Sequence, residues 1–232
     1  MGIAYNTNIV RDGLVLYLDA ANIKSYPGTG TVWNDLSGNG RNGTLINGVG
    51  YSSNNNGILS FDGTNDYIDV PLSESQLNFS SGFTWSTFVY VNDIVDNPST
   101  GFMSTYVGTT AGTASALKVE NARFEFRSYG LNLINTSNNI LPLQTWVMLT
   151  AVWNSSGSYQ LYENDKLVRS GGAPTSYSPS TGNSLRIGGG AYSMGVAANL
   201  KGSLSISQIY SRALSVNEVQ QNFNAMRGRY NV

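Results

Sequence analysis

Short apolar stretches alternate with turn-rich clusters along most of the chain, a pattern typical of an all-β sandwich or barrel. Residues 123–127 alternate strictly, so Phe124 and Phe126 are expected to face the core and the charged side chains the opposite face. Residues 14–18 and 146–153 are apolar at nearly every position, which predicts strands buried on both faces. We place the second of these strands at the centre of its sheet.

Two β-hairpins are predicted from pairs of short strands. Residues 58–61 and 67–70 are expected to pair around residues 62–65, where Asp-Gly supplies the positive φ that a tight turn needs. Residues 158–163 and 166–169 are expected to pair around the Asn-Asp dipeptide between them.

Two further strands show which face is buried. Residues 83–91 form a long strand whose side chains Trp85, Val89 and Val91 share one face. In residues 203–207, Leu204 and Ile206 are expected to face inward and the three serines outward, as in a half-exposed strand.

One stretch has a helical pattern. Ser215 and Glu218 have the spacing of a capping box, and Leu214 and Val219 occupy the positions of a hydrophobic staple. The apolar face continues beyond them, which predicts a short C-terminal helix over residues 216–227.

Charged residues make up only 12% of the chain, and 13 basic residues nearly balance 14 acidic ones. No cluster of Lys and Arg exceeds two neighbours, so the basic stripe that nucleic-acid binding needs is absent. No apolar run approaches the length of a membrane span, and the start of the chain lacks the pattern of a signal peptide. We expect neither nucleic acid nor membrane insertion.

The sequence contains no histidine and no cysteine. A Ser-His-Asp triad, a thiolate metal site and disulfide bonds are therefore excluded. Any catalysis would have to rely on carboxylates.

Residues 12–22 resemble the opening of concanavalin A-like lectin/glucanase (LamG-type) domains, as do residues 33–40 and 42–45. Residues 61–70, with the sequence FDGTNDYIDV, are similar to the most recognisable motif of that family. The resemblance spans residues 12–230. It implies a jelly-roll sandwich of two antiparallel sheets, one of them concave.

The resemblance also implies a domain layout and a location. We expect an N-terminal extension, residues 1–11, and one sandwich domain, residues 12–232. Lys24-Ser25-Tyr26 and residues 226–230 resemble the versions found in tailed-bacteriophage proteins, where the domain sits on the virion as a capsid decoration or a tail adhesin. This implies synthesis in the host cytoplasm, a place on the virion surface, and capsid or tail proteins as partners.

Glycoside hydrolases of this fold carry their acids as Glu-x-Asp-x-x-Glu on one strand, so catalysis must be weighed. Glu163 and Asp165 match the first half of that motif, but Val168 stands where the second Glu is required. The two acids also flank a predicted hairpin turn, which would not project them together into a cleft. We interpret them as structural.

Calcium is the cofactor that the family resemblance raises, because LamG-like domains often bind it through loop oxygens. The candidate ligands are Asp62, Asn65, Asp66 and Asp69, with Asp19 and Asp35 as neighbours from other segments. The alternative is that these side chains make turn hydrogen bonds. Ser205 stands where related domains often carry an acidic residue, which favours the alternative.

Sugar recognition needs an aromatic platform beside amide, hydroxyl or guanidinium groups. Residues of these types that fall near predicted strand ends or in loops are Tyr106, Arg127, Tyr129, Asn132 and Tyr192. For each of them, packing is the competing interpretation.

Taken together, these features favour a non-enzymatic virion accessory protein that presents a lectin-like domain to surface glycans. The alternatives are a carbohydrate-active enzyme of the same fold and an architectural homo-oligomer without a ligand. The oligomer would leave a large apolar patch on one sheet or on residues 1–10.

Overall fold

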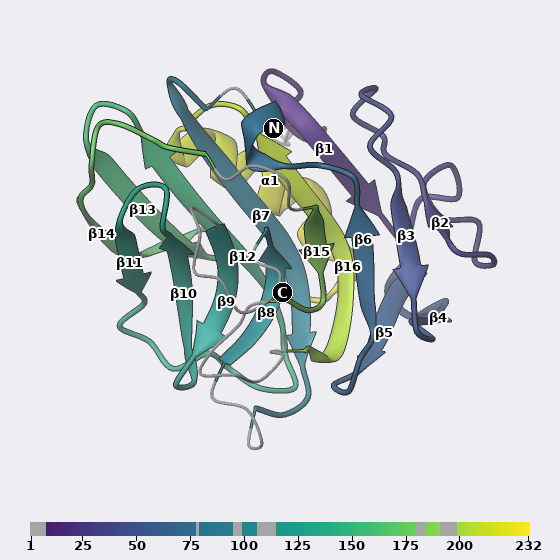
Figure 1. The fold of residues 1–232 in the computed structure, drawn as a ribbon. Helices are drawn as coiled ribbons and strands as arrows, with labels where there is room; N and C mark the ends of the chain where they lie inside the picture. The colour runs from purple at the N-terminus through teal and green to yellow at the C-terminus, as the bar shows by residue number, and fades with distance from the viewer. Residues whose placement is uncertain (1–7, 78, 95–98, 106–114, 180–183, 191–198) are drawn as a thin grey trace, which may run out of the picture.

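The computed structural model describes residues 8–77, 79–94, 99–105, 115–179, 184–190 and 199–232. Two antiparallel sheets of eight strands each pack face to face, with one short α-helix near the C-terminus (Figure 1). The predicted all-β sandwich with a C-terminal helix is confirmed. No helix of the described residues is long and apolar enough to cross a membrane.

Sheet A is built around the long strands near the middle and end of the chain. Its strands, in spatial order, are β14 (Lys166–Gly172), β13 (Ser158–Glu163), β12 (Trp146–Asn154), β7 (Gly82–Val91), β16 (Lys201–Tyr210), β5 (Ile58–Asp62) and β4 (Gly50–Ser52), and β1 (Leu14–Asp19) also pairs with β16. The central position of β12 and the β13–β14 hairpin are as predicted.

Sheet B is the second layer of the sandwich. Its strands, in spatial order, are β11 (Leu133–Thr136), β10 (Arg123–Ser128), β9 (Ser115–Glu120), β8 (Ser99–Ser104), β15 (Leu185–Ile187), β6 (Tyr67–Val70), β3 (Gly43–Ile46) and β2 (Val32–Trp33). Three short 3-10 helices complete the described elements: η1 (Asn54–Asn56), η2 (Glu74–Gln76) and η3 (Arg227–Arg229).

The main core lies between the two sheets. Phe83 and Trp85 of sheet A meet Phe126 of sheet B, with ring centroids 5.4 and 5.9 Å apart, and Trp153 lies 5.4 Å from Phe83. Both Phe side chains of β10 are buried in this core, as the strict alternation predicts.

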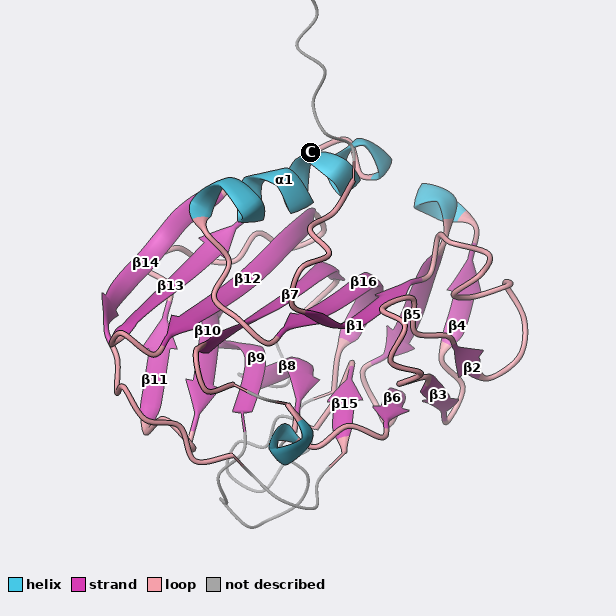
Figure 2. Cartoon of the chain, turned by 90° about the horizontal axis from the view of Figure 1, so that it is seen from above, coloured by secondary structure: helices cyan, strands magenta, loops and turns pink. Residues whose placement is uncertain are grey.

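A second core lies on the other face of sheet A, where helix α1 (Val216–Met226) covers the strands (Figure 2). Phe88 stacks on Tyr230 at 4.4 Å and on Phe223 at 6.2 Å. The capping box of Ser215 and Glu218 is present, and the α-helix ends at Met226, one residue before the predicted end.

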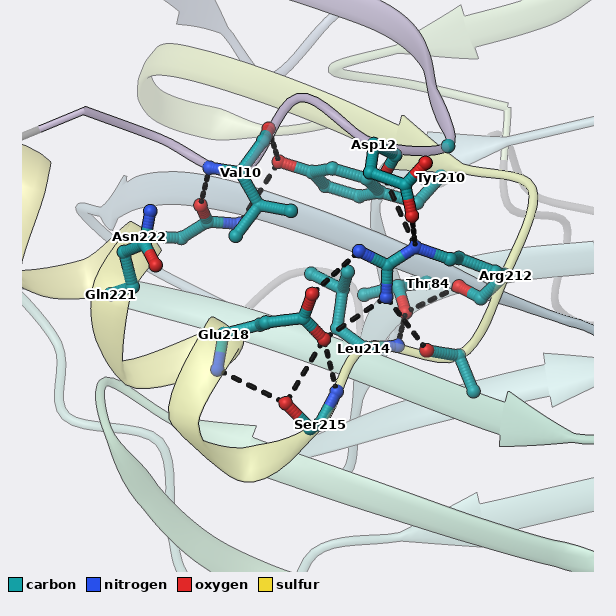
Figure 3. A network of polar contacts seen from close by, with 12 residues as sticks. Val10, Asp12, Thr84, Tyr210, Arg212, Leu214, Ser215, Glu218, Gln221 and Asn222 are labelled. Atoms are coloured by element: carbon teal, nitrogen blue, oxygen red, sulfur yellow. Dashed lines mark hydrogen bonds and ion pairs between the residues drawn. The ribbon is translucent and has the colours of Figure 1, made fainter.

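Residues 8–11, the described part of the predicted N-terminal extension, pack on this second core. The Val10 amide donates to Asn222 of α1 at 2.8 Å, and the Tyr210 hydroxyl donates to the Val10 carbonyl at 3.1 Å (Figure 3). Ile9 and Val10 are both buried. These residues therefore join the sandwich to its helix.

The predicted hairpin over residues 58–70 is wrong. Strand β5 pairs with β4 and β16 in sheet A, whereas β6 pairs with β3 and β15 in sheet B. The Asp-Gly turn does have its positive φ, at Gly63, but it carries the chain from one sheet to the other.

The predicted half-exposed strand over residues 203–207 is also wrong. A β-bulge between Leu204 and Ile206 reverses the alternation, so Leu204 faces the main core and Ile206 the second core. Ser205 and Ser207 are fully buried, because β16 has a covered face on both sides.

Candidate functional site

The outer face of sheet B, which points away from sheet A, is charged where strands β9, β10 and β11 lie side by side. Leu117, Val119, Phe124 and Phe126 face the core, so the alternate positions of the same strands face outward. The pairing places Lys118 beside Glu125 and Glu125 beside Thr136. This register brings charged groups together from three strands.

Glu125 is the centre of this charged cluster. Its carboxylate contacts Arg127 Nη2 at 3.1 Å and Lys118 Nζ at 3.5 Å, and Thr136 donates a hydrogen bond to it at 2.9 Å. Lys118 also pairs with Glu120. Lys118 and Glu125 are 1% and 2% exposed, so their charges need this mutual pairing.

Arg127, a predicted ligand-binding residue, leaves the cluster toward the end of β10. Burial lowers the pKa of Arg127. The Glu125 carboxylate and a hydrogen bond with Tyr129 raise this pKa by more than burial lowers it, so the net shift is upward. The guanidinium is thus held in place from both sides.

Tyr129 and Asn132 form the ends of the turn between β10 and β11. The Asn132 amide donates to the Tyr129 carbonyl at 3.0 Å, and Asn132 has a φ of 50°, a conformation that asparagine tolerates better than most residues. The Tyr129 side chain is 40% exposed. Arg127, Tyr129 and Asn132 therefore lie together, while Tyr106 and Tyr192 lie outside the described residues.

The turn is docked on the segment that follows β14. Ser178 donates its amide to the Gly130 carbonyl at 2.9 Å, and a Cβ at Gly130 would lie 2.2 Å from the Ser178 carbonyl oxygen. An open concavity of about 520 Å³ adjoins the turn at Tyr177. It is lined by aromatic and short polar side chains, among them Phe79, Trp153, Tyr177, Ser75, Gln76 and Ser176.

The four predicted calcium ligands do not converge. The Asp62 carboxylate accepts from the Thr64 amide at 2.7 Å, and the Asp66 carboxylate accepts from the Asp62 amide at 3.1 Å. Asp69 lies on β6 and accepts from Ser184 at 2.5 Å, and Asn65 is exposed.

Among the residues that the structure describes, no three acidic side chains come close enough to hold a metal ion. Burial raises the pKa of Asp66, so its charged form, which a cation needs as a ligand, is disfavoured. Calcium binding stays a prediction. The four candidate ligands, as the structure places them, do not fit a calcium site.

The neighbouring acids also have structural partners. Asp19 accepts from Tyr17 at 2.9 Å and from Arg229 at 2.7 Å, and Asp35 accepts from the Tyr17 amide at 3.0 Å. Ser205, at the family's acidic position, donates to the Gly57 carbonyl at 2.8 Å. The Ser205 hydroxyl therefore makes a local hydrogen bond at the position where related domains often carry an acidic residue.

Glu163 and Asp165 flank the β13–β14 turn, as predicted. The Glu163 carboxylate accepts from Ser137 at 3.0 Å and from Asn139 at 3.2 Å. Asn164 has a φ of 59° in the turn between the two acids.

Sequence reasoning missed a polar cleft, which we call the edge cleft. It is an open space of about 520 Å³ lined by Arg123, Asn135, Thr136, Ser137, Asn138 and Arg169. The only local signal was the polar run of residues 135–139 at the end of β11. The arginines come from β10 and β14 and show no spacing that relates them.

Comparison with solved structures shows the same fold in several binding and catalytic proteins. The receptor-binding domain of botulinum neurotoxin C/D mosaic serotype matches with a TM-score of 0.69 at 16% identity, over 92% of this chain and 51% of that one. The binding domain of Paraclostridial Mosquitocidal Protein 1 matches with a TM-score of 0.68 at 19% identity, over 93% and 52%.

Trypanosoma rangeli sialidase, in complex with 2,3-difluorosialic acid, matches with a TM-score of 0.67 at 16% identity, over 92% of this chain and 33% of the enzyme. The chain thus spans about half or a third of these proteins, and the likeness concerns the fold alone. The comparison with curated proteins returned no match.

The family model of the concanavalin A-like lectin/glucanases superfamily matches residues 62–220, more than half of the chain. This range begins at the second residue of the FDGTNDYIDV motif and ends within helix α1. The chain belongs to the concanavalin A-like lectin/glucanase superfamily.

Proposed function

We propose that this protein is a non-catalytic binding module that takes a glycan at the β10–β11 turn. The observation that carries the proposal is the position of Arg127 at the end of β10, next to Tyr129 and Asn132 of the exposed turn and beside an aromatic concavity. A ring with a guanidinium and an amide beside it offers both an apolar surface and directed hydrogen bonds to a sugar. The buried Lys118–Glu125 pair keeps this arrangement rigid.

The arrangement of carboxylates supports a non-catalytic role. A retaining glycosidase needs two carboxyl groups about 5–5.5 Å apart on either side of the sugar bond. Glu125 is 2% exposed and contacts Lys118, Arg127 and Thr136, so a substrate does not reach it. Glu163 is held by two side chains of the loop after β11.

The covered face of sheet A supports a binding module over an architectural oligomer. Helix α1 occupies the face that such an oligomer would use, and Ile9 and Val10 are buried within their own chain. A single species of monomer mass in solution is the expected result.

We propose further that the module is displayed on a phage virion, as a capsid decoration or a tail adhesin. The support is the sequence resemblance at Lys24-Ser25-Tyr26 and at residues 226–230. Mass spectrometry of purified particles tests this proposal: the chain is expected among the virion proteins, and its absence would leave a free lectin.

Glycan-array binding tests the site itself. The Tyr129→Ala variant removes an exposed ring and is expected to lose at least about tenfold in affinity, equivalent to ~1.4 kcal/mol. Tyr51→Ala is the matched control, because Tyr51 is 37% exposed and lies on β4, at the opposite edge of the sandwich (Figure 2). Equal losses in both variants, or no binding by the wild type, would contradict the proposed site.

A further inference from the structure

The edge cleft lies where the sandwich is open. Strand β11 is the edge of sheet B and β14 is the edge of sheet A, and both lie at the same side of the molecule (Figure 2). Asn135 pairs with Phe126, whose ring is in the core, so the Asn135 side chain points into the space between the two edges. The cleft therefore has walls from both sheets.

Two arginines from different sheets converge on one residue of this cleft. Arg123 of β10 donates to the Asn138 carbonyl oxygen, and Arg169 of β14 donates to Asn138 Oδ1 at 3.1 Å. Arg169 Nε also donates to the Tyr159 hydroxyl at 3.3 Å. Asn138 thus accepts a hydrogen bond from each guanidinium group, one at its backbone carbonyl and one at its side chain.

Neither arginine forms an ion pair with a carboxylate in the described part of the chain. Arg127, the other arginine of β10, differs in this respect because it is paired with Glu125. Two acids contact the lining. Glu163 accepts a hydrogen bond from Ser137, and Glu125, which is already paired with Arg127, accepts one from Thr136. Two like charges held together without a counterion favour an anion.

Asn135 supplies an independent observation. Asn135 is only 9% exposed, it lines the cleft, and its buried Nδ2 group has no hydrogen-bond acceptor among the described residues. A buried amide donor without a partner costs about 1–3 kcal/mol. An acceptor atom in the cleft would satisfy it.

We propose that the edge cleft is a subsite for the anionic group of an acidic glycan, either a carboxylate or a sulfate ester. This inference rests on the proposed glycan-binding function and names the class of sugar. The planar fork of guanidinium donors matches two oxygens of one oxyanion, and the Asn135 amide provides a further donor. A neutral sugar would leave both positive charges without compensation.

The test is an NMR titration of the full chain with sodium sulfate, with glucuronate and with neutral glucose, at constant ionic strength. The side-chain amide of Asn135 and the Nε–H signals of Arg123 and Arg169 report occupancy of the cleft. Arg169→Gln is expected to weaken anion binding about tenfold. Lys166→Gln removes one exposed charge from the same strand and is expected to change the affinity less than about twofold.

A saturable shift with glucuronate alone identifies a carboxylate ligand, and one with sulfate alone identifies a sulfate ester. No saturable shift with either anion up to about 100 mM would overturn the inference. Equal losses in Arg169→Gln and Lys166→Gln would also overturn it, because they would indicate a general effect of charge.

The inference and the proposed function fail separately. Neutral glycans that bind through Tyr129 while both anions leave Asn135 unshifted would support the proposed function and overturn the subsite. Anions that bind the cleft in a chain that retains no glycan on an array would support the anion site and overturn the glycan function.

Discussion

Arg212 links the first turn of helix α1 to Asp12, which is distant in sequence. It contacts Glu218 in the first turn of α1 at 2.5 Å and Asp12 at 2.8 Å, and its Nε donates to the Asp12 carbonyl at 3.2 Å (Figure 3). Glu218 in turn accepts from the Ser215 amide at 2.8 Å, as part of the capping box. One carboxylate therefore serves the helix cap and the ion pair together.

Glu218 should make the protein sensitive to acid. The hydrogen bond from Arg212 lowers the pKa of Glu218 from its ordinary 4.5 to about 2, against the opposing effect of burial. A lowered pKa means that the ionised group stabilises the fold fully above pH 4.5, and that this stabilisation is lost as the pH falls toward 2. Thermal unfolding midpoints from pH 7 to pH 2 measure the loss.

The Glu218→Gln variant is expected to be less stable at pH 7, by ~1 kcal/mol, and to lose less stability on acidification than the wild type. Asp165→Asn is the control, because it removes one carboxylate from the β13–β14 turn, outside the contacts of Arg212 and the helix cap. A Glu218→Gln variant with the full acid dependence of the wild type would contradict this account.

The candidate site was predictable only where it is local. Arg127, Tyr129 and Asn132 lie within six residues of one another, so their nearness in the chain alone places them in one region. Arg123 lies on β10 and Arg169 on β14; three strands lie between them in the chain, and the two strands belong to different sheets. The alternation of apolar and polar residues along a strand does not predict which sheet the strand joins or which other strand edge lies beside it.

At the scale of elements, strand β16 shows how a single extra residue at a β-bulge changes which side chains face each side of a strand. It pairs with β7 along one side, and along the other with β5 in its first half and β1 in its second. The bulge lies between Leu204 and Ile206, where the partner changes. Alternation alone predicts one buried face, whereas α1 and the opposite sheet bury both.

The serine at the bulge should therefore matter more than its neighbour. Ser205 donates to the Gly57 carbonyl at 2.8 Å and accepts from the Tyr230 hydroxyl at 2.8 Å, in a fully buried position. Ser205→Ala is expected to lower the free energy of unfolding by about 1–3 kcal/mol, because both partners lose a buried bond. Ser203→Ala, half-buried in the same strand, should stay within about 0.5 kcal/mol.

Urea unfolding of the two variants and the wild type gives the comparison. The slopes of the transitions should agree, so that the midpoints report stability alone. Equal midpoints for Ser205→Ala and Ser203→Ala would mean that the bulge serine is dispensable.

For the whole molecule, local sequence patterns predicted the fold class, but they did not predict to which of the two sheets each strand belongs. The Asp-Gly turn was correctly placed, and yet β5 and β6 belong to different sheets, because turn chemistry fixes φ and leaves the next partner open. The second core arises when residues 8–11 and α1 meet on sheet A, a contact between the two ends of the chain.

That second core should set the alkaline limit of the fold. Its tyrosines Tyr17, Tyr210 and Tyr230 are buried, and burial is the main cause that raises their pKa, to about 12 for Tyr230. A raised pKa means that the neutral hydroxyl stabilises the fold fully below the ordinary pKa of 10, and that this stabilisation is lost as the pH rises above it. Tyrosine absorbance and far-ultraviolet circular dichroism, followed together from pH 8 to pH 13, measure the effect.

Part of the tyrosinate absorbance is expected to appear only together with the loss of β structure, since these hydroxyls ionise when the helix leaves sheet A. Tyr230→Phe gives the matched variant: it loses the hydrogen bond to Ser205, at a cost of about 1 kcal/mol near neutral pH, and declines less steeply above pH 10. Complete tyrosine titration while the circular dichroism stays native would show that the second core opens without unfolding. The packing of α1 on sheet A would then be lost separately from the main core and at lower pH.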